Sequence, residues 1–114
     1  TALGAAMGVT RLVEIVRTHP YGRGSGVPDI IIVSPPLTVP TEHVDLKPIF
    51  APRAEEAQLF AGYYGRIAEE LHCGFFDAAI VAAATPLDGV HLDAKNTRAI
   101  GEGLVPVVKS VLGL

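Results

Sequence analysis

The chain has 114 residues, which is enough for one domain at most. Its composition, 49% hydrophobic and 18% charged, is typical of a globular protein, and the longest apolar runs fall well short of the roughly 18 residues of a transmembrane helix. A formal net charge of −3 argues against nucleic acid and against an anionic membrane as partners.

The first predicted element is a helix over residues 2–18. Apolar residues recur there at the spacing of one helix face, namely at Ala5, Val9, Leu12, Val13 and Val16. Pro20 should end this helix, because proline disfavours helical backbone in the residue before it. We interpret the glycine-rich segment 21–28 as a flexible connection, since it precedes a strand, whereas a phosphate-binding loop follows one.

The clearest strand is predicted at residues 29–34, a β-branched run typical of a parallel strand that is buried on both faces. The segment 35–53 contains five prolines and no visible period, so we expect a long loop. Because this loop leaves the carboxyl end of a strand, where open α/β sheets place their sites, we interpret it as a pocket wall or a contact surface between subunits.

Residues 54–72 have the pattern of a second helix, and Gly74 is its expected C-terminal cap. Gly62 and Gly65 inside it should allow close packing. Residues 75–77 predict a second strand, with residues 78–81 as an optional extension. The expected buried stripe of the second helix consists of Ala57, Phe60, Ala61, Tyr64, Ala68 and Leu71.

A last helix is predicted over residues 94–112, with Asp93 as its N-cap and a kink at Pro106. The order helix, strand, helix, strand, helix predicts an α/β fold with a parallel sheet and helices on its faces. Two strands, however, make a poor sheet, and independent stability usually needs three or more. Either these residues are the C-terminal part of a larger fold, or another chain supplies the missing strands.

The segment between the second strand and the last helix contains Asp88-Gly89-Val90-His91. An aspartate at this spacing can accept the Nδ1–H of the histidine, which fixes the tautomer and directs Nε2 outward as a general base. The same spacing is also compatible with Asp88 and Asp93 capping turns while His91 is an ordinary surface residue.

These features together resemble the C-terminal half of the SGNH (GDSL-type) serine hydrolases, and most closely the bacterial aryl esterases and acyltransferases. The resemblance is carried by strand 29–34 with its prolines, by Phe75-Phe76-Asp77, and above all by residues 88–93 before a final helix. It implies a three-layer α/β/α sandwich with a parallel, flavodoxin-like sheet. Residues 1–114 would then be the C-terminal part of a single SGNH hydrolase domain, and the N-terminal part that bears the nucleophile would lie outside them.

The resemblance also implies an activity, namely hydrolysis of aryl or short-chain carboxylic esters, or acyl transfer, through a Ser-His-Asp acyl-enzyme mechanism. Asp88 would be the orienting acid and His91 the general base. The family's Gly-Asp-Ser block and its oxyanion Gly and Asn blocks do not occur here, so this chain supplies no nucleophile, and alone it should not catalyse at enzymatic rates. The expected partners are a small ester and the N-terminal segment, and self-association into a homo-oligomer is also expected. No cofactor is expected.

Other reactive residues are weaker candidates. Ser34 ends a strand, but Pro35 and Pro36 follow it, and we expect its hydroxyl to satisfy loop backbone. Cys73 is expected to be a buried structural thiol, and as the single cysteine it leaves the redox compartment open. A metal held by Asp88, His91 and Asp93 is disfavoured, because no second histidine is near. Two hypotheses from other functional classes stay open, namely a non-catalytic association domain and a flavodoxin-like ligand-binding half.

Overall fold

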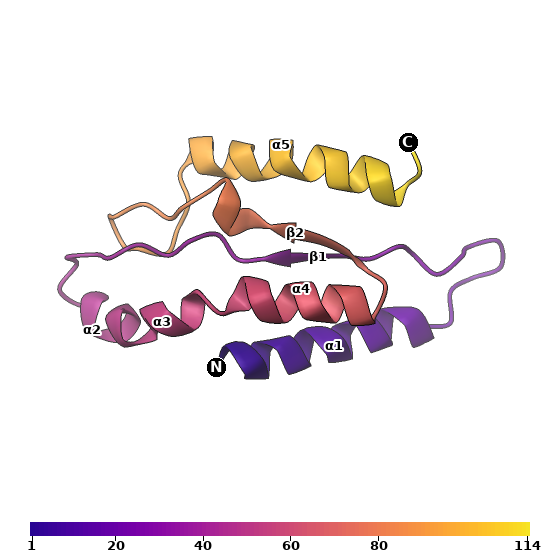
Figure 1. The fold of residues 1–114 in the computed structure, drawn as a ribbon, viewed down its shortest axis with the longest axis horizontal. Coiled ribbons are helices and arrows are strands. Elements are labelled where there is room, and N and C mark those ends of the chain that lie inside the picture. The colour runs from indigo at the N-terminus through magenta and orange to yellow at the C-terminus, as the bar shows by residue number, and fades with distance from the viewer.

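The computed structural model describes residues 1–114 and contains a two-stranded parallel sheet with helices on both faces (Figure 1). Its elements are, in chain order, α1 (Ala2–Thr18), β1 (Ile31–Ser34), α2 (Lys47–Phe50), the 3-10 turn η1 (Ala51–Arg53), α3 (Ala54–Ala57), α4 (Phe60–Glu70), β2 (Gly74–Asp77), the 3-10 turn η2 (Ala78–Ile80) and α5 (Ala94–Val111). Helices α1 and α4 cover one face of the sheet, and α5 covers the other. The predicted α/β fold with a parallel sheet between helical layers is confirmed.

The two strands run side by side, with Ile31 opposite Gly74 and Ser34 opposite Asp77. Ile32 of β1 is buried in the main apolar cluster together with Val13 of α1 and Ala68 of α4. The carboxyl ends of both strands point toward the same edge of the sheet, so the segments that follow them leave side by side.

The predicted first helix is confirmed at both ends. The Thr1 side chain accepts a hydrogen bond from the Gly4 N–H at 3.0 Å, which satisfies one of the free donors of the first turn. The helix stops at Thr18, just before His19-Pro20. The expected stripe is wrong at Leu12, which is 62% exposed.

The predicted helix over residues 54–72 is interrupted, because α3 ends at Ala57 and α4 begins at Phe60. The expected cap at Gly74 is also wrong: His72 takes the left-handed conformation with φ of 54°. Gly74 instead opens β2, where a Cβ would lie 2.9 Å from a methyl group of Val111 and 3.0 Å from the Ile31 side chain. The packing role expected for glycines in this helix holds at Gly65, where a Cβ would lie 3.3 Å from Phe75, whereas Gly62 faces open space.

The predicted loop 35–53 contains more structure than expected, since α2 and η1 occupy its second part. Its first part continues alongside the segment that follows β2. Leu37 forms a parallel bridge with Ala83, through the Leu37 N–H to the Ala82 carbonyl and the Ala84 N–H to the Leu37 carbonyl. The two segments that follow the strands therefore remain paired beyond Ser34, in the direction of the turn that contains Asp88.

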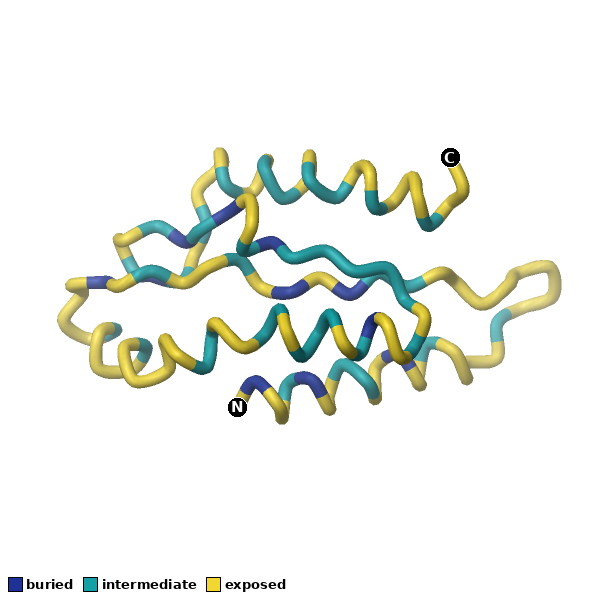
Figure 2. The backbone as a smooth tube through the Cα atoms, in the orientation of Figure 1, coloured by how far each residue is buried: buried dark blue, intermediate teal, exposed yellow.

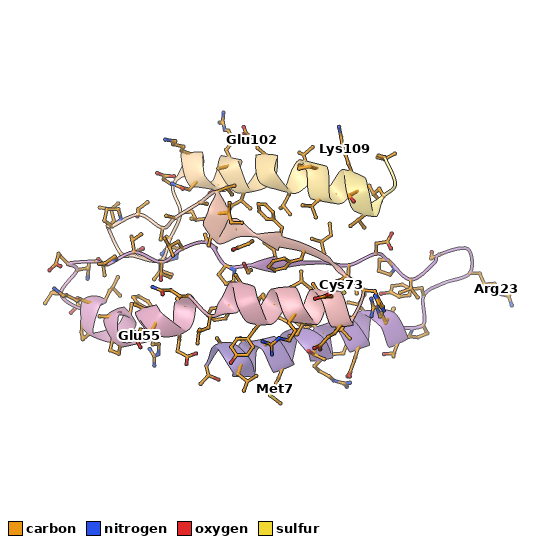
Figure 3. The ribbon with its side chains drawn as sticks, viewed as in Figure 1. Met7, Arg23, Glu55, Cys73, Glu102 and Lys109 are labelled. Carbon is orange, nitrogen blue, oxygen red and sulfur yellow. The ribbon has the colours of Figure 1, made fainter.

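The second strand does not extend to residue 81. The Asp77 carboxylate accepts the Ala79 N–H at 3.0 Å, which starts η2 and turns the chain away from the strand. Helix α5 begins as predicted, with Asp93 accepting the Asn96 N–H, and it contains Pro106. Figure 3 shows Glu102 and Lys109 on the face of α5 that points away from the sheet. Gly103, on the inner face, brings α5 so close to Phe76 that a Cβ there would clash with the ring.

The core is small, and the sheet has an open edge. Only 11 of 114 residues are buried, and Figure 2 shows that they lie scattered over the helices, the strands and the connecting loops. An apolar groove of about 210 Å³ runs between α1 and β1. Val33, expected to be buried on a two-sided strand, is 39% exposed and lines this groove. None of the helices has the length and apolar character that crossing a membrane requires.

Candidate active site

The structure brings Asp88 and His91 together in the turn between η2 and α5. His91 Nδ1 lies 2.6 Å from Asp88 Oδ2, and the other carboxylate oxygen, Oδ1, accepts the N–H groups of Val90 and His91, each at 2.8 Å. The carboxylate is thus oriented by backbone donors, and the imidazole is oriented by the carboxylate. In neutral His91 the proton then lies on Nδ1, and Nε2 has a free lone pair.

The backbone donors also set the charge of the site. The N–H groups of His91 and Val90, followed by the His91 ring, lower the pKa of Asp88 to about 2. The acid is therefore ionised at neutral pH. The Asp88 side chain is 25% exposed, whereas the His91 side chain is 84% exposed, so the pair presents its imidazole outward. This arrangement can accept a proton at Nε2 and stabilise the resulting imidazolium.

Local hydrogen bonds close the turn. The Thr85 N–H donates to the His91 carbonyl at 2.8 Å, and the Gly89 N–H donates to the Thr85 carbonyl at 2.8 Å. Gly89 has a φ of 80°, and a Cβ built there would lie 2.4 Å from the Val39 carbonyl oxygen. Only glycine fits this position, both for its backbone conformation and for its space.

The proline-rich segment after β1 holds the turn from one side. The Val39 N–H donates to the Gly89 carbonyl at 3.1 Å, and the Thr41 hydroxyl donates to the Leu87 carbonyl at 3.2 Å. Sequence reasoning placed this segment at a pocket wall or a subunit contact and missed its bonds to the turn. No local sequence pattern marks these bonds.

Helix α5 holds the turn at its base. The Asn96 side-chain oxygen accepts the Ala83 N–H at 3.0 Å, and Asp93 Oδ1 accepts both the backbone and the side-chain N–H of Asn96 at 2.8 Å. The two hydrogen bonds that Asp93 accepts from Asn96 lower the pKa of Asp93, and the bond from the Asn96 backbone has the larger effect. Asp93 is therefore a helix cap and does not converge on His91, and no group of three or more His, Cys, Asp or Glu side chains is arranged to hold a metal ion.

A cavity of about 630 Å³ lies beside the turn, between the start of α1, the segment after β1 and helices α2 to α4. Gly89, Val39 and Thr41 belong both to its lining and to the contacts that hold the turn, while Phe50 and Phe60 contribute aromatic surface. Asp88 and His91 themselves do not line it. Across the cavity, the Glu56 carboxylate accepts the Ala2 N–H at 2.6 Å and so joins α3 to the start of α1.

The remaining candidates lie apart from the pair. Ser34 is 0% exposed, and its hydroxyl donates to Asp77 Oδ1 at 2.8 Å, so the expected bond to loop backbone is wrong. Cys73 is half-buried at the amino end of β2, the end remote from the turn (Figure 3). Its sulfur lies 3.6 Å from an Arg17 guanidinium nitrogen. His43 remains exposed in the loop, where its Nδ1 accepts the Asp45 N–H at 3.3 Å.

Solved structures of several esterases share this fold. A carbohydrate acetylesterase family member from Sinorhizobium meliloti is 49% identical, with a TM-score of 0.94 over 100% of this chain and 54% of its own. A putative arylesterase from Agrobacterium tumefaciens is 40% identical, with a TM-score of 0.85 over 94% and 50%. The aryl esterase of M. smegmatis is 32% identical, with a TM-score of 0.87 over 97% and 53%.

The chain thus spans about half the length of the solved structures that it matches, which agrees with the resemblance to one half of such a protein. No protein-family model and no curated protein matches the sequence. The identities of 32–49% nevertheless extend over nearly all of the chain. The predicted resemblance to the aryl esterases is therefore confirmed over nearly all of the chain.

Proposed function

We propose that the complete protein is a carboxylic-ester hydrolase and that this chain supplies its orienting acid, Asp88, and its general base, His91. The observation that carries the proposal is the hydrogen-bonded pair, in which an ionised carboxylate holds Nδ1 and leaves Nε2 free and exposed. The names of the related structures, acetylesterase and aryl esterase, support the same reaction class.

In the proposed mechanism, a serine hydroxyl attacks the ester carbonyl while His91 Nε2 accepts its proton. The imidazolium, stabilised by Asp88, then protonates the leaving alcohol, and an acyl-enzyme remains. In the second half, His91 takes a proton from water, which hydrolyses the acyl-enzyme, or from an alcohol, which gives acyl transfer. No cofactor takes part in these steps.

The serine must come from outside residues 1–114. Ser34, the serine at the end of β1, is fully buried and bonded to Asp77, and no serine hydroxyl in this chain bonds to His91. We propose that these residues form the C-terminal part of one domain, whose N-terminal part carries the nucleophile and the oxyanion donors. The open edge of β1, the small core and the half-length match to the related structures support this division.

The proposed substrates are small aryl or short-chain esters, including acetyl esters of sugars. The related structures carry the names of both classes. The cavity beside the turn has the size of a small-ligand pocket, and it offers two phenylalanine rings to the acyl or alcohol part of an ester.

The test is turnover of p-nitrophenyl acetate by the full-length protein and by its Asp88→Asn and His91→Ala variants. Both changes should lower kcat by at least about a thousandfold, because the members of a triad act as a unit. His19→Ala is a matched control, since this exposed histidine lies at the end of α1. Unchanged turnover in folded Asp88→Asn and His91→Ala proteins would contradict the proposal and favour a non-catalytic association domain.

A further inference from the structure

We propose that Thr41 is a positioning residue for the Asp88–His91 pair, an inference that rests on the proposed esterase function. Thr41 lies in the proline-rich segment, 46 residues before Leu87, and it is 5% exposed. Its hydroxyl donates to the Leu87 carbonyl at 3.2 Å and accepts the His43 N–H at 3.1 Å. A buried hydroxyl that uses its donor and an acceptor site at once has one orientation, so it can fix the group that it binds.

Leu87 needs such a contact because its side chain does not anchor it. That side chain is 81% exposed, although the residue directly precedes Asp88. The backbone at this point is therefore held through its carbonyl, which accepts a hydrogen bond from the Thr41 hydroxyl.

The two bonds from the proline-rich segment bracket the acid. Thr41 binds the Leu87 carbonyl, and Val39 binds the Gly89 carbonyl, so the residues on both sides of Asp88 are tied to the same proline-rich segment. Any rotation of the Leu87–Asp88 peptide would move the carboxylate that orients His91. Of these two bonds, the Val39 bond is made by backbone alone, so Thr41 is the side chain through which the arrangement can be altered.

The experiment compares Thr41→Val, Thr41→Ser and Thr10→Val in the full-length protein. Valine keeps the volume of threonine and removes the hydroxyl, whereas serine keeps the hydroxyl and removes the methyl. Thr10 is the matched control, since its half-buried hydroxyl also donates to a carbonyl, that of Ala6, but within α1.

Thr41→Val should lower kcat for p-nitrophenyl acetate by between about tenfold and a hundredfold, because small misplacements of a catalytic group have effects of this size. The loss should fall mainly on kcat rather than on KM, and the nitrogen NMR signals of the His91 ring should shift. Thr41→Ser should restore most of kcat and the wild-type signals, and Thr10→Val should change neither.

A folded Thr41→Val protein with wild-type kcat and wild-type His91 signals would overturn the inference. A Thr41→Ser protein as impaired as Thr41→Val would also overturn it, because the methyl group and not the hydroxyl would then matter. If Thr41→Val fails to fold, Thr41→Ser decides: kcat and His91 signals close to the wild type are expected, and a clear loss of kcat with shifted signals would overturn the inference. The ring signals separate this inference from the proposed function: a His91 signal that responds to Thr41→Val in a protein without esterase activity would support positioning and reject the esterase.

Discussion

His91 Nδ1 and Asp88 Oδ2 lie 2.6 Å apart within one turn, three residues from each other in the sequence. The pair forms locally, because the same carboxylate also accepts the backbone N–H of His91. The remaining part of the fold is needed for the direction in which the pair points, and that direction is set by the proline-rich segment and by α5.

The first prediction concerns the pH dependence of stability. The pKa of Asp88 is lowered to about 2 by backbone N–H groups, below the usual value of about 3.9 for an unfolded chain. The stabilisation from its ionised form should therefore be present above about pH 4 and be lost as the pH falls to about 2. The free energy of unfolding of the wild type and of Asp88→Asn, measured from pH 7 to pH 2, should differ at neutral pH and converge in acid. A difference that persists at pH 2 would contradict this origin.

The second prediction separates two reasons for glycine at position 89, namely its positive φ and its close contact with the Val39 carbonyl oxygen. Gly89→Ala places a Cβ 2.4 Å from the Val39 oxygen at a positive φ, and it should lower the free energy of unfolding by about 3 kcal/mol or more. Gly24→Ala is the control, because Gly24 has a similar φ of 82° with nothing within 4 Å, and it should cost only about 1 kcal/mol. Urea denaturation measures both. Equal costs would mean that the contact with Val39 does not matter.

The third prediction concerns Ser34, which we expect to stabilise the sheet and not to react. Ser34→Ala removes a buried hydrogen bond to the Asp77 carboxylate and should cost about 2 kcal/mol of unfolding free energy, with esterase activity retained. Ser110→Ala, on the exposed end of α5, should change stability by less than about 0.5 kcal/mol. A folded Ser34→Ala protein without activity would make Ser34 a candidate nucleophile after all.

The fourth prediction concerns the open edge of β1. If the N-terminal part of the domain covers the groove between α1 and β1, then residues 1–114 and that part, prepared as two polypeptides, should associate and regain esterase activity. Val33→Lys places a charge in the groove and should abolish this complementation. Leu112→Lys, at the exposed end of α5, should leave it intact. Equal complementation by both variants would place the contact elsewhere.

Features with local causes could be predicted from the sequence. The β-branched run of β1, the Asp93 cap of α5 and the Asp88–His91 bond depend on residues within a few positions of one another. The prediction of a helix cap at Gly74 was wrong because the reason for this glycine lies far away in the sequence. Glycine is needed there because Val111, far along the chain, packs against it, and His72 adopts the left-handed conformation in its place.

The contacts from the proline-rich segment to the turn could not be predicted, because they join residues more than 40 positions apart. Nothing near Thr41 in the sequence indicates that its hydroxyl meets the Leu87 carbonyl. Likewise, the partner of Ser34 is Asp77, its neighbour across the sheet and not along the chain. A single sequence shows such pairs only after the register of the strands is known.

The most direct test of the central claim is to map where a serine-directed fluorophosphonate reacts in the full-length protein. The proposal predicts one labelled serine outside residues 1–114, and it predicts that His91→Ala abolishes the labelling, because the base activates that serine. Labelling of Ser25, Ser34 or Ser110, or equal labelling of the His91→Ala protein, would contradict the claim that this chain supplies the acid and base for a nucleophile carried elsewhere.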